Sequence, residues 1–230
     1  MAPKHVVIFG RPGSGKSSLA ERIGVDFGFR LVRTGEMLRE AVRRGDALGK
    51  RLEDMLKGGN LVPDDMMFEI LGQTLTDPGE NKLLFDGFPR TTGQIPQLAE
   101  LERLHHFEVG CYFDVAVSRD EAVARMTGRR VCPVCGATYH LVARPPRVEG
   151  RCDRDDAPLE QRRDDSSGVI EQRQRVYERH AEPILAYYRA HAPAKVHAVD
   201  GGRPFDAVYA EARRVLGLNG GGVERTPGPG

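Results

Sequence analysis

The chain has 230 residues, of which 40% are hydrophobic and 29% are charged, proportions that are typical of a globular protein. Its 34 Lys and Arg residues nearly balance its 33 Asp and Glu residues, which argues against the basic field of a nucleic-acid-binding protein. No hydrophobic run approaches the ~20 residues that cross a bilayer, and the apolar stretch near the N-terminus is too short for a secretory signal. We therefore expect a cytoplasmic protein that contacts neither membrane nor nucleic acid.

Hydrophobic periodicity divides the chain into alternating strands and helices. Residues 5–9 predict a buried strand, and the glycine-rich turn after it leads into a helix that carries Leu19, Ile23 and Phe27. Further strands are expected at 29–32, 83–85, 110–117 and 195–199, and further helices at 37–42, 48–56, 64–75, 94–104, 118–128, 169–189 and 205–216. Strands separated by helices pair in parallel through right-handed crossovers. The sequence therefore predicts an α/β fold, a five-stranded parallel sheet covered by helices.

Two segments interrupt this alternation, and we expect both to be mobile insertions. One is the helical pair within 33–62, and the other is the Gly-, Pro- and Cys-rich stretch 128–165. The remaining core is expected to comprise residues 1–32, 63–127 and 166–217. The tail, 218–230, is so rich in Gly and Pro that we predict it to be disordered.

Residues 10–17, GRPGSGKS, match the phosphate-binding pattern G-x-x-x-x-G-K-[ST] between a predicted strand and a predicted helix. Glycines let the backbone wrap around phosphate oxygens with its N–H groups pointing inward, and the lysine reaches the β- and γ-phosphates. One of the two serines that follow the lysine is expected to reach Mg²⁺. The sequence thus predicts a P-loop NTPase fold that binds ATP with Mg²⁺ through Gly13, Ser14, Gly15, Lys16, Ser17 and Ser18.

The cysteines predict a structural Zn²⁺ site. Two knuckles of x₂ spacing, 132–135 and 152–155, are separated by 16 residues, as in a zinc ribbon whose fourth ligand is a carboxylate. Asp156 or His140 could compete for that fourth place, and free thiols in a metal-free segment are the alternative. The ligands that we predict are Cys132, Cys135, Cys152 and Asp155.

Three further motifs carry a family resemblance: TGEMLR at 34–39, LVPD at 61–64 and DGFPRT at 86–91. With the P-loop, and in this order and spacing, they resemble the adenylate kinases over residues 5–216. The resemblance implies reversible phosphoryl transfer from ATP to AMP, giving ADP, by a monomer with a closing lid. It also implies that 33–62 binds AMP and that 128–165 is the zinc-binding lid.

The resemblance also implies roles for individual residues, and bidentate arginine contacts suit the phosphate of AMP. The AMP-binding positions that it implies are Thr34, Arg39, Asn60, Leu61, Val62, Gly87, Phe88, Pro89, Arg90, Gln94, Arg162 and Arg173. Beyond the P-loop, the implied ATP contacts are Arg129, Thr138, Tyr139 and Arg203. Because phosphoryl transfer depends on alignment and charge stabilisation, the implied catalytic residues are Lys16, Arg90, Arg125, Arg129, Arg162 and Arg173.

Some assignments stay open at the level of sequence. Asp164 and Asp165 match the family's acidic pair near the lid hinge, but Asp86 is an equally reasonable holder of magnesium-bound water. A kinase for UMP, CMP or GMP is the nearest rival, which Thr34, Gln94 and the long lid argue against. A zinc-ribbon nucleic-acid-binding ATPase would require a basic face with stacking aromatic residues, which the cysteine segment lacks.

Overall fold

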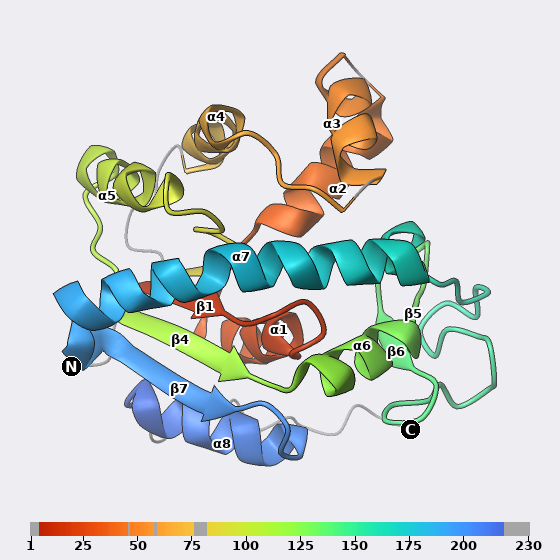
Figure 1. The fold of residues 1–230 in the computed structure, drawn as a ribbon. Helices are drawn as coiled ribbons and strands as arrows, with labels where there is room; N and C mark the ends of the chain where they lie inside the picture. The colour runs from red at the N-terminus through yellow and green to blue at the C-terminus, as the bar shows by residue number, and fades with distance from the viewer. Residues whose placement is uncertain (1–4, 46, 58, 76–81, 219–230) are drawn as a thin grey trace.

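A computed structural model describes residues 5–45, 47–57, 59–75 and 82–218 (Figure 1). Five strands form one parallel sheet in the order β2-β3-β1-β4-β7, which confirms the predicted sheet. The strands are β1 (His5–Phe9), β2 (Phe29–Arg33), β3 (Lys82–Asp86), β4 (Cys111–Ala116) and β7 (Val196–Asp200). Of the tail predicted to be disordered, 218–230, Leu218 is ordered and buried against the helices Lys16–Phe27 and Phe205–Val215, so the prediction was wrong there, and residues 219–230 lie outside the described residues.

Helices cover both faces of this sheet (Figure 1). One face carries α1 (Lys16–Phe27) and α8 (Phe205–Val215), and the other carries α4 (Asp64–Thr74), α5 (Gln94–Leu104) and α7 (Ser167–His191). The pair α2 (Thr34–Arg44) and α3 (Ala47–Lys57) follows β2, and α6 (Arg119–Thr127) follows β4. Single 3₁₀ turns span Arg163–Asp165 and Pro193–Lys195.

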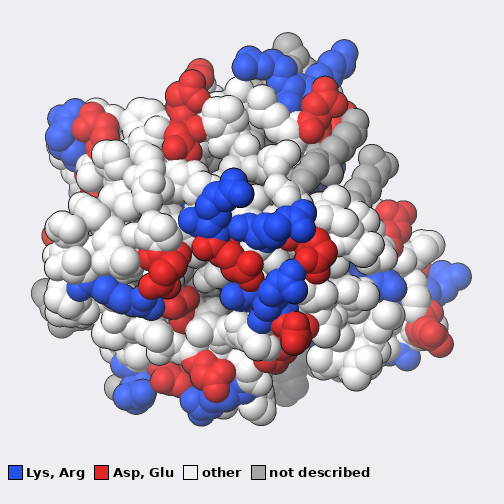
Figure 2. Space-filling view, in the orientation of Figure 1, with Lys and Arg blue, Asp and Glu red and all other residues white. Residues whose placement is uncertain are grey.

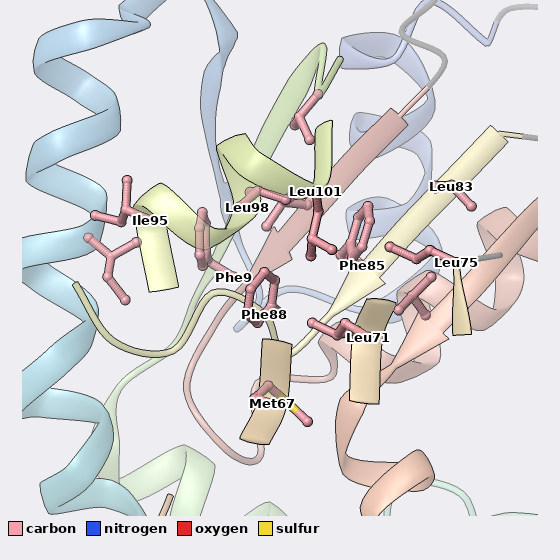
Figure 3. Packing of buried hydrophobic residues seen from close by; sticks show 14 of the residues in the cluster. Phe9, Met67, Leu71, Leu75, Leu83, Phe85, Phe88, Ile95, Leu98 and Leu101 are labelled. Atoms are coloured by element: carbon pink, nitrogen blue, oxygen red, sulfur yellow. The ribbon is translucent and has the colours of Figure 1, made fainter. Parts of the chain in front are cut away.

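The sheet has two separate cores because side chains alternate along each buried strand. In β1, Val7 and Phe9 belong to the larger core, whereas Val6 and Ile8 belong to the smaller one against α1 and α8. Figure 3 shows the larger core, in which aromatic rings of β1 and β3 meet apolar side chains of α4 and α5. This packing fixes the sheet beneath the loops that follow the strands.

The segment 128–165 has more regular structure than the sequence indicated. Strand β5 (Arg129–Val131) pairs antiparallel with β6 (Thr138–His140), although we predicted no strand there. Three-residue strands are too short for hydrophobic alternation to reveal them. The helix before this segment begins as predicted, since the Ser118 hydroxyl accepts a hydrogen bond from the Glu121 N–H at 3.2 Å.

Two loops and the first residue of a helix follow the carboxyl ends of neighbouring strands. The P-loop follows β1, Thr34 follows β2, and the turn at Gly87 follows β3. In open parallel sheets this edge is where ligands bind, so the topology brings the sequence motifs to one place.

Candidate active site

The P-loop glycines are required by the fold as well as by a phosphate. Gly10, Gly13 and Gly15 have positive φ angles of 149°, 91° and 87°. A Cβ on Gly13 would lie 2.3 Å from the carbonyl oxygen of Ala122 in α6, so this glycine lets the loop pack on that helix. A Cβ on Gly15 would meet no atom closer than 3.9 Å, so Gly15 is needed for its backbone angle. From the sequence, we explained Gly13 only by the close approach of a phosphate. The packing of the loop on α6 is a second reason for a glycine at this position.

Lys16, at the start of α1, is held in a positively charged environment. Its ammonium donates to the carbonyl oxygen of Arg11 at 3.5 Å. Burial lowers the pKa of Lys16 to about 8; the Asp86 carboxylate opposes this shift, and Arg90, Arg173 and Arg129 add to it. The site thus concentrates cationic groups around Lys16, an arrangement that an anionic ligand would stabilise.

Ser17 and Asp86 form a pair of oxygen ligands beside Lys16. The Ser17 hydroxyl donates to the Asp86 carboxylate at 2.5 Å, which joins the P-loop to the end of β3. Ser17 and Ser18, the two serines considered for the metal, are both exposed, and the hydroxyl that contacts Asp86 is that of Ser17. Hydroxyl and carboxylate oxygens are the donors that Mg²⁺ prefers, so this pair fits a Mg²⁺ ion that arrives with a nucleoside triphosphate.

A tight turn at Gly87 brings Thr34 and Arg90 together. The Thr34 hydroxyl and the Arg90 Nε both donate to the Gly87 carbonyl oxygen, each at 2.8 Å. Gly87 has a φ of +93°, and a Cβ there would lie 2.6 Å from both Thr34 Oγ1 and Arg90 Nη2. Any larger residue would therefore separate two of the predicted binding side chains.

A pocket beside this turn collects most of the residues predicted to bind AMP. Its lining residues are Thr34, Leu38, Leu56, Asn60, Leu61, Val62, Met67, Gly87, Arg90 and Gln94. Leu38, Leu56 and Met67 were not predicted as site residues, although their place in the helical hydrophobic pattern was a usable signal. Phe88 points into the larger core with 1% of its surface exposed, so its side chain does not line the pocket (Figure 3).

Arginines from separate elements converge on Asp164 and Asp165. Arg129 donates to both carboxylate oxygens of Asp165, at 2.7 Å and 2.6 Å, and the Asp165 side chain is fully buried. Arg173 on α7 lies 3.0 Å from an Asp164 oxygen and 3.3 Å from an Asp165 oxygen. Arg39 on α2 lies 3.9 Å from Asp164. The two carboxylates therefore link α2, β5 and α7.

Arg162 belongs to the same cluster. Burial lowers its pKa to about 10, and the positive charges of Arg129 and Arg39 lower it further, while Asp164 and Asp165 oppose the shift. Crowded positive charges of this kind favour the binding of a phosphate anion. Each guanidinium also has further N–H groups that could donate hydrogen bonds to the phosphate oxygens. The structure thus brings together four of the arginines singled out in the sequence: Arg39, Arg129, Arg162 and Arg173.

Besides Arg90, which lines the pocket, two predicted arginines lie outside that cluster. Arg125 on α6 donates to the backbone carbonyl oxygens of Ser14, at 3.3 Å, and Gly201, at 2.8 Å, so it borders the P-loop. The Arg203 side chain points to α8, where it pairs with Glu211 at 2.7 Å. The backbone of Arg203, and not its side chain, is therefore the part nearest the turn after β7. Their predicted nucleotide contacts stay predictions.

Sequence reasoning missed the contact between α7 and the P-loop. Gln174 is fully buried, and its Nε2 donates to the carbonyl oxygen of Pro12 at 2.9 Å. Its Oε1 accepts from Arg11 at 3.2 Å. Because Gln174 directly follows Arg173, this contact sets the position of that arginine relative to the phosphate loop. Nothing in the local sequence indicates a partner more than 160 residues away.

The predicted zinc ligands form one cluster. The ligand atoms of Cys132, Cys135, Cys152 and Asp155 all lie within 4.8 Å of one another. The Cys132 sulfur lies 3.3 Å from each Asp155 carboxylate oxygen, and the Cys135 and Cys152 sulfurs are 3.5 Å apart. Three thiolates and a carboxylate at these separations suit a tetrahedral Zn²⁺ ion with no open position.

The two competing ligands do not belong to this cluster, and only one ring nitrogen of His140 is hydrogen-bonded. His140 Nδ1 accepts from the backbone N–H groups of Val142 and Ala143, at 3.1 Å and 3.0 Å, and Asp156 pairs with Arg151 at 2.9 Å. Geometry therefore favours Asp155 as the fourth ligand. Tyr139, predicted to contact ATP, is instead buried in this cluster with its hydroxyl 3.4 Å from the Cys152 sulfur, while Thr138 stays half-buried.

The surface shows mixed charge. Figure 2 shows basic and acidic side chains interspersed over the face that α7 crosses, without a continuous basic stripe on that face. Within the described residues, no helix combines the length and the apolar character needed to span a membrane.

Comparison with known proteins agrees with this site. The sequence model of the family described as adenylate kinase matches residues 8–193. A protein named adenylate kinase from Moorella thermoacetica is 38% identical over 214 residues, covering 93% of this chain and 98% of the relative. Those from Archaeoglobus fulgidus and Bacillus subtilis are each 36% identical over 92% and 93% of this chain, and 97% and 98% of the relatives. Fold, site and relatives place the chain among the P-loop nucleoside monophosphate kinases. Within that class, it belongs to the adenylate kinase family.

Proposed function

We propose that this protein transfers the γ-phosphoryl group of MgATP to AMP reversibly, giving two ADP molecules. The observation that carries the proposal is the place of Arg90. This arginine lines the pocket beside Gly87 and donates to the Gly87 carbonyl oxygen, and the preceding residue, Asp86, accepts a hydrogen bond from Ser17 of the P-loop. A phosphate held by Arg90 would therefore be adjacent to the phosphates of a nucleotide on the P-loop, as direct transfer requires.

On the donor side, the P-loop holds the triphosphate. Backbone N–H groups of the loop and the N-terminus of α1 bind phosphate oxygens, and Lys16 binds the β- and γ-phosphates. Ser17 and Asp86 hold the Mg²⁺ ion, directly or through its water, since they already share a hydrogen bond. Of the further ATP contacts, Thr138 and the backbone at Arg203 face the base or ribose.

On the acceptor side, the pocket holds AMP. The apolar residues Leu61 and Val62 pack on the base, and Gln94 forms hydrogen bonds with its polar edge. Arg39, Arg90 and Arg173 orient the phosphate so that one oxygen faces the γ-phosphoryl group. Phe88 acts from the core by holding the turn at Gly87 in place.

Between the two nucleotides, the arginine cluster stabilises the transferring group. Asp164 and Asp165 form ion pairs with Arg129 and Arg173. Phosphate oxygens compete for the same N–H donors, so binding redistributes these contacts toward the reacting centre. Arg162 supplies a further guanidinium, and Arg125 supports the loop beneath the γ-phosphate.

We further propose that residues 33–62 and 128–165 are mobile units on a core formed by the rest of the described chain. Closure of the 128–165 segment as a lid would exclude water, because water would otherwise accept the phosphoryl group. Cys132, Cys135, Cys152 and Asp155 would hold a structural Zn²⁺ that keeps this segment rigid while it moves. The protein is proposed to act in the cytoplasm as a monomer.

The test is a comparison of acceptors with purified protein and MgATP. We expect AMP to be phosphorylated with the highest kcat/KM among AMP, GMP, CMP and UMP, with two ADP formed for each ATP and AMP consumed. A preference for another monophosphate would replace the proposed acceptor. ATP hydrolysis without transfer to any acceptor would overturn the proposal.

A further inference from the structure

Gln94 is held by two groups of opposite hydrogen-bonding character. Its Oε1 accepts from the Arg90 backbone N–H at 2.7 Å, and its Nε2 donates to Asp64 Oδ1 at 2.8 Å. Asp64, the first residue of α4, also accepts from the Thr91 hydroxyl through Oδ2 at 2.8 Å. With 3% of its surface exposed, Gln94 has little room to exchange these partners for water.

These partners permit only one orientation of the amide. An ionised carboxylate accepts hydrogen bonds only, and a backbone N–H donates only. If the amide turned over, its oxygen would face the Asp64 carboxylate and its NH₂ would face the Arg90 N–H. Both contacts would be repulsive, and the Asp64 oxygen and the Arg90 N–H would each lose a partner.

The orientation determines which base edge Gln94 can match. A primary amide has two N–H donors and an oxygen with two lone pairs, so one donor and one acceptor remain for a ligand in the pocket. Adenine presents an amino donor beside a ring-nitrogen acceptor, which a fixed donor and acceptor can match. A 6-oxopurine has an acceptor in place of the amino group, and an amide that could turn over would match it as well.

We propose that Asp64 is a positioning residue for acceptor specificity, which fixes the Gln94 amide so that the pocket takes a 6-aminopurine and rejects a 6-oxopurine. The inference rests on the proposed function, because Gln94 must contact the acceptor base. The fixed amide discriminates by repulsion, because it makes the binding free energy of a 6-oxopurine less favourable.

The test compares AMP with IMP, a 6-oxopurine that lacks the extra amino group of GMP. Asp64→Asn keeps the size of the side chain but can both donate and accept, so of the two contacts that fix the amide only the one from the Arg90 N–H remains. Asp65→Asn is the matched control. It removes the same charge from the same first turn of α4, and Asp65 contacts the backbone N–H of Met66 instead of Gln94.

We expect Asp64→Asn to raise the ratio of kcat/KM for IMP to that for AMP by at least about tenfold, since a hydrogen bond to a charged group enforces the orientation. Asp65→Asn should leave this ratio and the KM for MgATP within about twofold of the wild type. Both substrates are measured on one preparation, so partial unfolding cancels from the ratio.

An unchanged ratio in Asp64→Asn, or an equal rise in Asp65→Asn, would overturn the inference. Wild-type protein that does not phosphorylate AMP would remove the proposed function and this inference with it. Wild-type turnover of AMP combined with an unchanged ratio in Asp64→Asn removes the inference alone.

Discussion

Binding of a nucleoside triphosphate should draw a proton onto Lys16, by an amount that increases with pH. The pKa of Lys16 is lowered to about 8 because the ammonium is buried and faces Arg90, Arg173 and Arg129. Phosphate groups beside the lysine favour its charged form and raise this pKa again. The bound state therefore carries more protons than the free state wherever free Lys16 is partly neutral.

The magnitude follows from that pKa. At pH 7 about 0.9 of free Lys16 is protonated, so binding takes up about 0.1 proton; at pH 9 only about 0.1 is protonated, and binding takes up about 0.9. Affinity should fall correspondingly above pH 8, approaching tenfold for each further pH unit. Below pH 7, Lys16 should contribute almost no pH dependence.

Calorimetry with a non-hydrolysable ATP analogue and Mg²⁺ measures this uptake, using buffers of different ionisation enthalpy at pH 7, 8 and 9. Lys16→Arg is the matched variant, because a guanidinium remains charged throughout this range. Uptake that increases with pH in the wild type and is absent in the variant supports the reasoning. Uptake that stays constant with pH, or persists equally in Lys16→Arg, would refute it.

Three further outcomes test the metal site, the acceptor pocket and the buried ion pair. Cys132→Ala should lower zinc content by atomic spectroscopy and lower the melting temperature more than activity in the cold, whereas Asp156→Asn should change neither. Arg90→Lys should raise the KM for AMP at least about tenfold and that for ATP far less, because the planar guanidinium is lost; equal effects in steady-state kinetics would contradict the pocket. Asp165→Asn should lower the free energy of unfolding by about 3–5 kcal/mol in denaturant titration, because its side chain is fully buried between Arg129 and Arg173. Asp164→Asn should cost less, since the Asp164 side chain is 28% exposed, and equal losses would argue against burial as the cause.

Much of the fold was predictable because local patterns carry the information. The strand at 5–9 and the helix at 94–104 were predicted with their observed ends, since an apolar residue stands at or next to each end. Helix α2 begins at Thr34, three residues before the first apolar residue that indicated it, because Thr-Gly-Glu carries no hydrophobic period. The strands β5 and β6 were missed for a similar reason, as each is only three residues long.

The site residues also divide into those that the sequence predicted and those that only the structure located. Motif spacing predicted the Cys132 and Cys152 knuckles, because each depends on residues that are near neighbours in the chain. Spacing left the fourth metal ligand open among three side chains. The structure favours Asp155 because its carboxylate lies with the three cysteine sulfurs, whereas His140 and Asp156 do not belong to that group.

By itself, the sequence determined the parallel sheet, the phosphate loop and the family, since these depend on periodicity and on short motifs. Only the tertiary structure decided which groups are partners: Arg129 with Asp165, Gln174 with the carbonyl of Pro12, and Asp64 with Gln94. Such pairs join segments 30 to 162 residues apart. Their geometry depends on how whole helices pack on the sheet, and no local pattern in the chain encodes that packing.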